Sequence, residues 1–336
     1  MSVQRRNNVR VSGDGPATVF FAHGFGCDQN MWRLFAPAYA KRYRTVLFDL
    51  VGSGASDLSA YDSNKYGSLQ GYADDVLELV REFSVGPAIF VGHSVSAMIG
   101  MLANLKDPAP FAAQVMIGPS PCYINDGDYV GGFSRSDIES LLETLEGNYL
   151  GWSSNMAPAI MGAPEQPELG AELTNSFCRT DPEIAKQFAS VTFLSDNRAQ
   201  VPLLTTPTLI VQCNDDIIAP LSVGDYLKRY LPRSTLRVVD NVGHCPHLSA
   251  PGQCAQAVGL GLFIVNQVTK AHGGKTEVRS SADAGRPSML RSPENSQHSP
   301  HHLSHPARSS ASQQEGERRS LPRETFLVRF WLQWDR

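Results

Sequence analysis

The chain has 336 residues, of which 42% are hydrophobic and 18% are charged, and its formal net charge is −4. This composition is typical of a soluble protein long enough for one large α/β domain or two smaller ones. Residues 273–336 hold ten of the 29 basic side chains and seven of the 33 acidic ones, so the remainder is mildly acidic. An acidic body argues against nucleic acid as a partner.

Neither the cysteines nor the apolar runs indicate secretion or a membrane. The six cysteines are scattered without a C-x-x-C pair, which is typical of reduced thiols and not of a disulfide framework or zinc site. The first residues are polar, and no apolar run reaches the roughly 18 residues that span a bilayer. We therefore expect a cytoplasmic protein without a membrane partner.

Two predicted strands come first, and each ends in a glycine-containing loop. The strand over 18–22 leads into 23–26, which reads His-Gly-Phe-Gly and can fold back with its amides pointing inward, as an oxyanion hole requires. The strand over 44–49 leads into a loop with Gly-Ser-Gly at 52–54. That loop lacks the third glycine of a dinucleotide site and the lysine of a P-loop, which argues against nucleotide binding.

Residues 88–100 combine an apolar run that stops at Gly92 with a helix-compatible run that begins after Ser94. A strand must therefore turn sharply into a helix at the serine, as in a nucleophile elbow. Such a turn exposes the Ser94 hydroxyl and leaves the N–H of Val95 free at the start of the helix. Gly92 supplies one of the two small residues that the turn needs, and Ser96 stands where the usual pattern has a second glycine.

The segments around the elbow alternate between helix and strand. Apolar positions three and four apart predict an amphipathic helix over 69–83, and 113–117 is predicted to be a strand. After residue 194 the alternation resumes, with predicted elements over 208–213, 221–231, 235–239 and 253–271. This order favours an α/β fold with a mostly parallel sheet, right-handed crossovers and helices on both faces.

Residues 123–194 interrupt the alternation because they contain no β-rich run. Glycine and proline breaks separate helical stretches, which we place at 134–151, 153–160, 168–178 and 182–193. A helical block between two strands predicts a four-helix cap over the carboxyl edge of the sheet. Seven large side chains of this block are candidates for lining a pocket above Ser94: Tyr123, Phe133, Trp152, Met156, Met161, Phe188 and Phe193.

We expect two or three of these seven to contact a ligand and the others to hold the cap helices together. His23 and His93 flank the site and are expected to shape it and not to act as bases, and the Phe25 side chain is expected to form part of the pocket wall. The candidate substrate-binding residues are therefore Phe25, His93, Phe133, Trp152, Met156 and Phe193.

A serine hydroxyl becomes a useful nucleophile only when a base takes its proton. The chain supplies a serine, an aspartate and a histidine in the order nucleophile, acid, base, each after a predicted strand. Carboxyl ends of parallel strands share one edge of a sheet, so the three side chains can meet there. We predict a triad of Ser94, Asp216 and His244, with the amides of Phe25 and Val95 as the oxyanion hole and no cofactor or metal.

Two triad positions have competitors in the sequence. Asp215 is an alternative acid, but Asp216 lies deeper in its loop, whereas Asp215 is expected to face solvent. His247 is an alternative base, but His244 follows a glycine, as a tight turn out of a strand needs. His247 follows Pro246 and is expected to be structural.

Five separated motifs carry a resemblance to a known family. They are FGCDQ at 25–29, FDLVGSG at 48–54, GHSVS at 92–96, GPSPCY at 118–123 and GHCPH at 243–247. In this order they are similar to α/β-hydrolases of the RsbQ and karrikin and strigolactone receptor type, over about residues 5–270. The resemblance implies an α/β-hydrolase fold, a cap of four helices, a small apolar pocket and the same triad.

The resemblance also implies slow hydrolysis of a small hydrophobic ester, lactone or butenolide-like ligand, coupled to signalling in which the cap engages a regulatory protein, as in a stress response. Two functions therefore compete: a serine hydrolase, and a ligand sensor with slow turnover. A protein with a vestigial site is disfavoured by the complete triad, and a haloalkane dehalogenase by the serine at 94, where that chemistry uses an aspartate.

The predicted organisation is a core over 1–122, the cap over 123–194 and the second part of the core over 195–272. Beyond residue 273 Ser, Pro, His, Arg and Gln dominate. Such a composition cannot bury enough apolar surface to offset its ordering entropy, so 273–336 is predicted to be a disordered tail.

Overall fold

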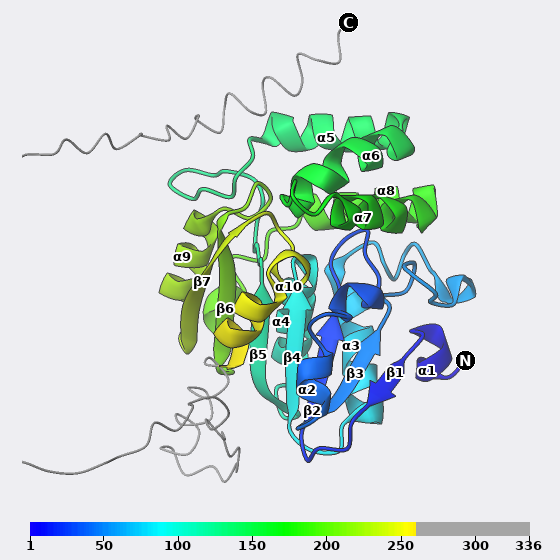
Figure 1. The fold of residues 1–336 in the computed structure, drawn as a ribbon, viewed down its shortest axis with the longest axis vertical. Coiled ribbons are helices and arrows are strands. Elements are labelled where there is room, and N and C mark those ends of the chain that lie inside the picture. The colour runs from blue at the N-terminus through cyan, green and yellow to red at the C-terminus, as the bar shows by residue number, and fades with distance from the viewer. Residues whose placement is uncertain (260–336) are drawn as a thin grey trace, which may run out of the picture. The chain divides into compact units, whose positions relative to one another are not determined.

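The computed structural model describes residues 1–259, whose centre is a seven-stranded sheet in the order β1-β3-β2-β4-β5-β6-β7 (Figure 1). The short β1 runs antiparallel to β3, and all other neighbouring strands in this sheet are parallel. This confirms the prediction of a mostly parallel sheet. The strands are β1 (Arg10–Ser12), β2 (Thr18–Ala22), β3 (Arg44–Phe48), β4 (Ala88–His93), β5 (Phe111–Ile117), β6 (Thr208–Asp215) and β7 (Ser234–Val242).

Both faces of the sheet are buried, because alternate residues of each strand point to opposite sides. In β2, Val19 and Phe21 join one apolar cluster, and Phe20 and Ala22 join the other. Helices therefore cover both faces, as predicted. Outside the cap, the helices are α1 (Val3–Arg6), α2 (Pro37–Ala40), α3 (Leu69–Phe83), α4 (Val95–Lys106), α9 (Leu221–Tyr230) and α10 (Pro246–Ser249).

The cap consists of four helices inserted between β5 and β6, and Figure 1 shows them above the carboxyl ends of the strands. Two ion pairs join α7 to the segment that follows β2, Arg33 with Glu172 and Arg179 with Asp28. The Arg33–Glu172 pair is exposed and contributes little stability, whereas the Asp28 carboxylate is buried. The cap helices are α5 (Arg135–Gly147), α6 (Tyr149–Met161), α7 (Pro167–Arg179) and α8 (Pro182–Phe193).

The prediction of one helix over 134–151 was wrong at its end. Helix α5 ends at Gly147, and Asn148 begins α6 as its N-cap residue, with its side chain accepting a hydrogen bond from the Gly151 N–H. Asparagine satisfies an otherwise unpaired helical N–H in this way, so it starts a new helix. Trp152 consequently belongs to the first turns of α6.

The predicted elements over 18–22 and 69–83 match β2 and α3, whereas α1 and β1 had not been predicted. The predicted helix over 253–271 is seen as helix over 251–259, and its remainder lies outside the described residues, as does the predicted disordered tail over 273–336.

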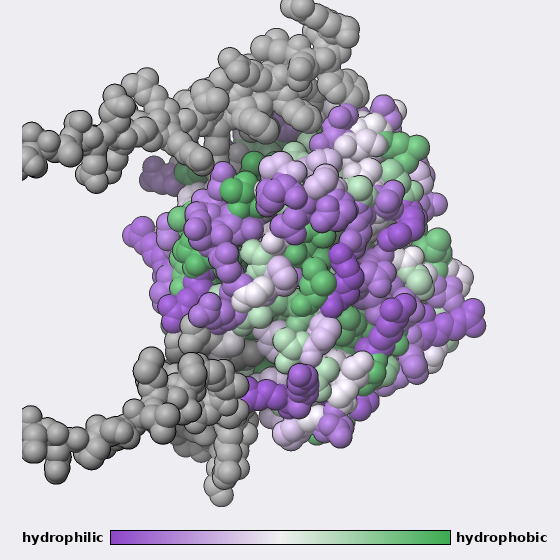
Figure 2. All heavy atoms as spheres, in the orientation of Figure 1, coloured by the Kyte–Doolittle hydropathy of each residue, from purple (hydrophilic) through white to green (hydrophobic). Residues whose placement is uncertain are grey.

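The visible face of the molecule is covered mainly by polar side chains, with apolar residues in small groups between them (Figure 2). Single exposed apolar residues are normal on a protein surface. Within residues 1–259, no helix is both long enough and apolar enough to cross a bilayer.

Candidate active site

Ser94 lies between β4 and α4 in a conformation that is rare for a residue with a side chain. Its φ is 55° and its ψ is −125°, a strained backbone that costs of order 1–3 kcal/mol. The Ser94 N–H donates to the Ile117 carbonyl at 2.8 Å, which holds the turn from the neighbouring strand. A Cβ on Gly92 would lie 2.5 Å from the Ser96 carbonyl oxygen, so this position requires glycine.

Ser96, which replaces the second glycine of the usual elbow pattern, is fully buried. Its hydroxyl donates to the carbonyl of His23, at the end of β2. The additional polar group is therefore paired, and it ties the elbow to the adjacent loop. The departure from the pattern leaves the turn intact.

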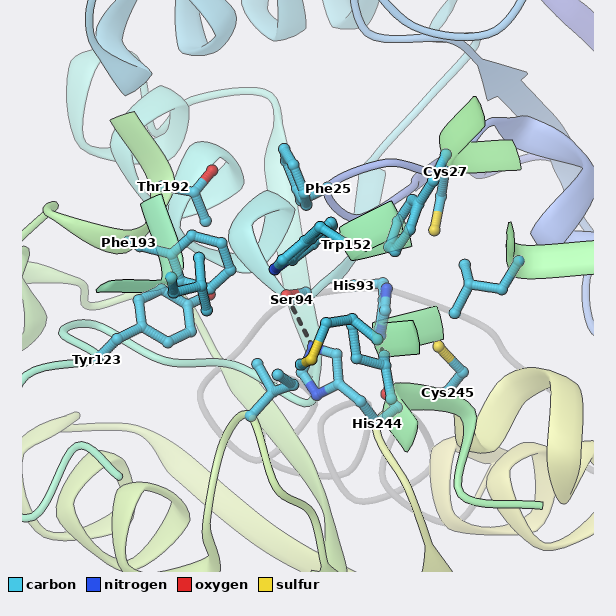
Figure 3. A pocket seen from close by; sticks show the side chains of 16 residues that line it. Phe25, Cys27, His93, Ser94, Tyr123, Trp152, Thr192, Phe193, His244 and Cys245 are labelled. Atoms are coloured by element: carbon cyan, nitrogen blue, oxygen red, sulfur yellow. Dashed lines mark hydrogen bonds between the residues drawn. The ribbon is translucent and has the colours of Figure 1, made fainter. Parts of the chain in front are cut away.

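Three side chains from separate strand ends form a hydrogen-bonded series. His244 Nε2 lies 2.8 Å from the Ser94 Oγ, a contact drawn as a dashed line in Figure 3, and His244 Nδ1 lies 2.7 Å from Asp216 Oδ2. Because the carboxylate can only accept, Nδ1 carries the proton and Nε2 is left to accept from the serine hydroxyl. All three side chains are buried.

The two adjacent aspartates have different surroundings. Asp216 is fully buried, and its Oδ1 accepts hydrogen bonds from the N–H groups of Ile218 and Ala219 at 2.8 and 3.1 Å. Asp215 is exposed at the end of β6, and its carbonyl accepts from the Gly243 N–H. The structure therefore brings Asp216 to the imidazole, and not Asp215.

The second histidine of the predicted pair, His247, lies in α10 behind the site. Its ring centroid is 4.5 Å from those of Trp32 and His93, and within the described chain neither of its ring nitrogens has a hydrogen-bond partner. His93 in turn donates from Nε2 to the carbonyl of His244 at 2.9 Å. His247 and His93 thus pack behind the imidazole of His244, and only His244 reaches the serine.

The side chain of His23 organises the loop after β2. The Leu50 N–H donates to His23 Nε2 at 3.0 Å, so the His23 proton is on Nδ1, which donates to the Gly24 carbonyl at 2.9 Å. Since carbonyl and N–H point in opposite directions in a trans peptide, this bond orients the N–H of Phe25. Among residues 1–259, neither the Phe25 N–H nor the Val95 N–H donates a hydrogen bond.

An apolar pocket lies beside Ser94 and is lined by residues of both the core and the cap. The ring of Phe25 lines it, and its centroid lies 5.7 to 6.2 Å from those of four other aromatic rings. No side chain with a permanent charge lines this pocket. The lining residues are Phe25, Cys27, His93, Ser94, Tyr123, Leu141, Trp152, Met156, Ile160, Leu173, Phe177, Thr192, Phe193, Ile218, His244 and Cys245.

Five of the six predicted substrate-binding residues line this pocket, and Phe133 does not. Phe133 is buried in a bridge with Ile124, where its N–H donates to the Tyr123 carbonyl and its carbonyl accepts from Asn125. The Phe133 side chain therefore packs in the core and does not line the pocket. Phe177 was missed, although its place one turn after Leu173 on an amphipathic helix could have indicated a pocket-facing side chain.

The described residues contain no group of three or more side chains that could hold a metal ion.

The loop that carries His244 is in direct backbone contact with the cap. The His244 N–H donates to the Ile160 carbonyl, in α6, at 2.8 Å. A Cβ on Gly243 would lie 2.1 Å from the Met161 carbonyl oxygen, so only glycine allows this approach. The end of α6 and the histidine loop therefore form one packed unit.

The sequence of residues 19–257 matches the alpha/beta hydrolase family. The chain belongs to this family. It is 39% identical to strigolactone esterase D14 of Arabidopsis thaliana and 38% identical to karrikin insensitive 2 receptor CA of Petunia hybrida, each over 74% of this chain and 93% of the relative. These matches confirm the resemblance to strigolactone and karrikin receptors.

The structure of a hydrolase from Oleispira antarctica is also similar to this alpha/beta hydrolase. The two superpose with a TM-score of 0.76 at 42% identity, covering 79% of this chain and 96% of the other. A similarity of this extent confirms the predicted fold.

The buried histidines of this hydrolase make its stability depend on pH. Burial lowers the pKa of His247 from 6.5 to about 3, so between these values the unfolded chain binds a proton that the folded chain excludes. The free energy of unfolding therefore falls as the pH drops through this window. From pH 7 to pH 5 the loss from His247 is roughly 2 kcal/mol.

Urea unfolding of the wild type and of His247→Phe at both pH values measures this loss. Phenylalanine keeps a ring against Trp32 but cannot be protonated, so the variant should lose about 2 kcal/mol less between pH 7 and pH 5. Equal losses in the two proteins would contradict the prediction.

Proposed function

We propose that this chain is a serine hydrolase that cleaves a small apolar ester or lactone through an acyl-enzyme. The observation that carries the proposal is the series Ser94–His244–Asp216, with contacts of 2.8 and 2.7 Å at the base of an apolar pocket. A nucleophile, a base and an orienting acid in this arrangement are sufficient for acyl transfer. The strigolactone esterase among its relatives supports the same activity.

In the proposed reaction, His244 Nε2 takes the proton of the Ser94 hydroxyl while Oγ forms a bond to the carbonyl carbon. The N–H groups of Phe25 and Val95 stabilise the oxyanion, an effect typically worth about 3 kcal/mol for each donor. His244 then gives the proton to the single-bonded oxygen as its bond to carbon breaks. Water attacks the acyl-enzyme by the same route, and Asp216 stabilises the charged imidazole throughout.

The pocket favours a small and uncharged substrate. Large apolar side chains from the core and the cap enclose it, and an ionised group would lose its hydration in a lining that offers no opposite permanent charge. The names of the relatives point to a butenolide-like lactone. We therefore propose an apolar ester or butenolide-type lactone as the substrate class.

A phosphonylating reagent tests the nucleophile directly. An alkyl fluorophosphonate should add one phosphonyl group to the intact protein, with the new mass on the peptide that contains Ser94. The His244→Ala variant should react at least about a hundredfold more slowly, because no base takes the serine proton. Labelling elsewhere, or at an unchanged rate in the variant, would contradict the proposal.

A second candidate function is ligand sensing, in which the same site reacts slowly and the cap recruits a regulatory protein. Two observations favour it: a relative at 38% identity is named as a receptor, and the His244 loop packs on the end of α6. Hydrogen exchange with and without a butenolide should then show altered protection in α6. Rapid turnover, together with hydrogen exchange in the cap that the butenolide does not alter, would contradict ligand sensing and leave only the hydrolase function.

A further inference from the structure

The Tyr123 hydroxyl is a buried polar group that the proposed mechanism does not use. Tyr123 follows β5, and its ring packs edge-on against Phe193 in the pocket wall, with centroids 5.2 Å apart. Within the described part of the chain its hydroxyl has no hydrogen-bond partner of normal geometry. The hydroxyl of Tyr149, near the same pocket, donates instead to the Phe177 carbonyl at 2.8 Å.

This hydroxyl is a donor whose proton is firmly held. Burial raises the pKa of Tyr123 to about 12, and its interaction with the Ser94 hydroxyl opposes only part of that rise. Ser94 itself donates to His244. The Tyr123 hydroxyl therefore lies beside the nucleophile with a proton that it can offer to an acceptor atom of a bound ligand.

The position of Tyr123 indicates which acceptor that is. Figure 3 shows Tyr123 and Phe25 on different sides of Ser94. In the proposed reaction the carbonyl oxygen of the substrate occupies the side of the Phe25 and Val95 amides. The remaining acceptor on the carbon that Ser94 attacks is the single-bonded oxygen of the ester, or the ring oxygen of a lactone.

We propose that the Tyr123 hydroxyl donates a hydrogen bond to this single-bonded oxygen, which makes Tyr123 a further catalytic residue. The inference rests on the proposed hydrolase function. Tyr123 keeps its proton: the electrons of the breaking carbon–oxygen bond go to the leaving oxygen, and His244 supplies the proton that oxygen gains. The hydrogen bond stabilises the charge that builds on the oxygen before the proton arrives.

A substrate class follows from this contact. Oxygen esters and lactones with poor leaving groups gain most from a donor at the leaving atom. Thioesters gain little, because a divalent sulfur is a weak acceptor. The site is therefore built to favour alkyl oxygen esters or lactones over thioesters of the same acyl group.

The test compares Tyr123→Phe with the wild type on two matched substrates, ethyl butanoate and S-ethyl thiobutanoate. The variant should lose about tenfold in kcat/KM on the oxygen ester, the equivalent of one hydrogen bond, and less than twofold on the thioester. Tyr129→Phe is the control, because the Tyr129 hydroxyl donates to the Cys122 carbonyl, next to Tyr123 in the chain. The Tyr129→Phe variant should change kcat/KM by the same factor on both substrates.

Equal losses on the two substrates in Tyr123→Phe would assign Tyr123 a purely structural role and overturn the inference. An unchanged rate on the oxygen ester would overturn it as well. Failure of the wild type to cleave either substrate would contradict the proposed hydrolase function itself. Thermal unfolding of each variant verifies that the fold is retained.

Discussion

Replacement of Ser94 by alanine is expected to lower kcat for a short-chain p-nitrophenyl ester by at least about 10⁴-fold. The loss is large because the alanine variant has no atom that can form the acyl-enzyme, and His244 and Asp216 have no nucleophile to activate. The remaining rate would come from the oxyanion amides and from substrate binding. Release of p-nitrophenol at saturating substrate measures it.

The matched control is Ser154→Ala, at an exposed serine of α6 whose hydroxyl donates only to the Leu150 carbonyl of its own helix. This variant should retain the wild-type rate. The Ser94→Ala protein should unfold close to the wild-type temperature, because the backbone hydrogen bond that holds the turn, from the N–H of residue 94 to the Ile117 carbonyl, is retained. Turnover by Ser94→Ala close to that of the wild type would remove the serine hydrolase assignment.

The second large effect is expected at Asp216. In Asp216→Asn the carboxylate that accepts from His244 Nδ1 is lost, so the imidazole can adopt the tautomer with its proton on Nε2 and can no longer take the serine proton. We expect a fall of about 10⁴-fold in kcat with a much smaller change in KM. Steady-state kinetics at neutral pH checks both values.

Asp215→Asn tests the same prediction from the adjacent position. Asp215 is exposed, and its carbonyl, not its carboxylate, pairs with Gly243, so this variant should keep nearly the full rate. If the two variants lost similar activity, or if Asp215→Asn lost more, the acid would be wrongly assigned.

The succession of strands and helices along the chain and the turn at Ser94 could be predicted because both depend on local patterns. An apolar run that ends in Gly92 and is followed by helix formers specifies an elbow whatever surrounds it, and β2 was predicted residue by residue. Proximity of the triad members also followed, since parallel strands place their carboxyl ends at one edge. These inferences needed only the spacing of apolar residues along the sequence and the parallel-sheet topology that this spacing favours.

The remaining features depend on packing between distant segments. Phe133 has the residue type of a pocket wall, but a bridge to Ile124 turns it into the core. The antiparallel β1 is only three residues long and fully exposed, so it carries no hydrophobic pattern. The proposed role of the Tyr123 hydroxyl could not be predicted either, because it depends on the contact of this side chain with Ser94, which is distant in the sequence.

The close approach of Gly243 to the end of α6 has a consequence for how this molecule responds to what it binds. A backbone hydrogen bond from the His244 N–H to the Ile160 carbonyl joins the cap to the residue that is proposed to accept the serine proton. A displacement of the end of α6 would therefore change the position of His244, and a displacement of His244 would change that of α6.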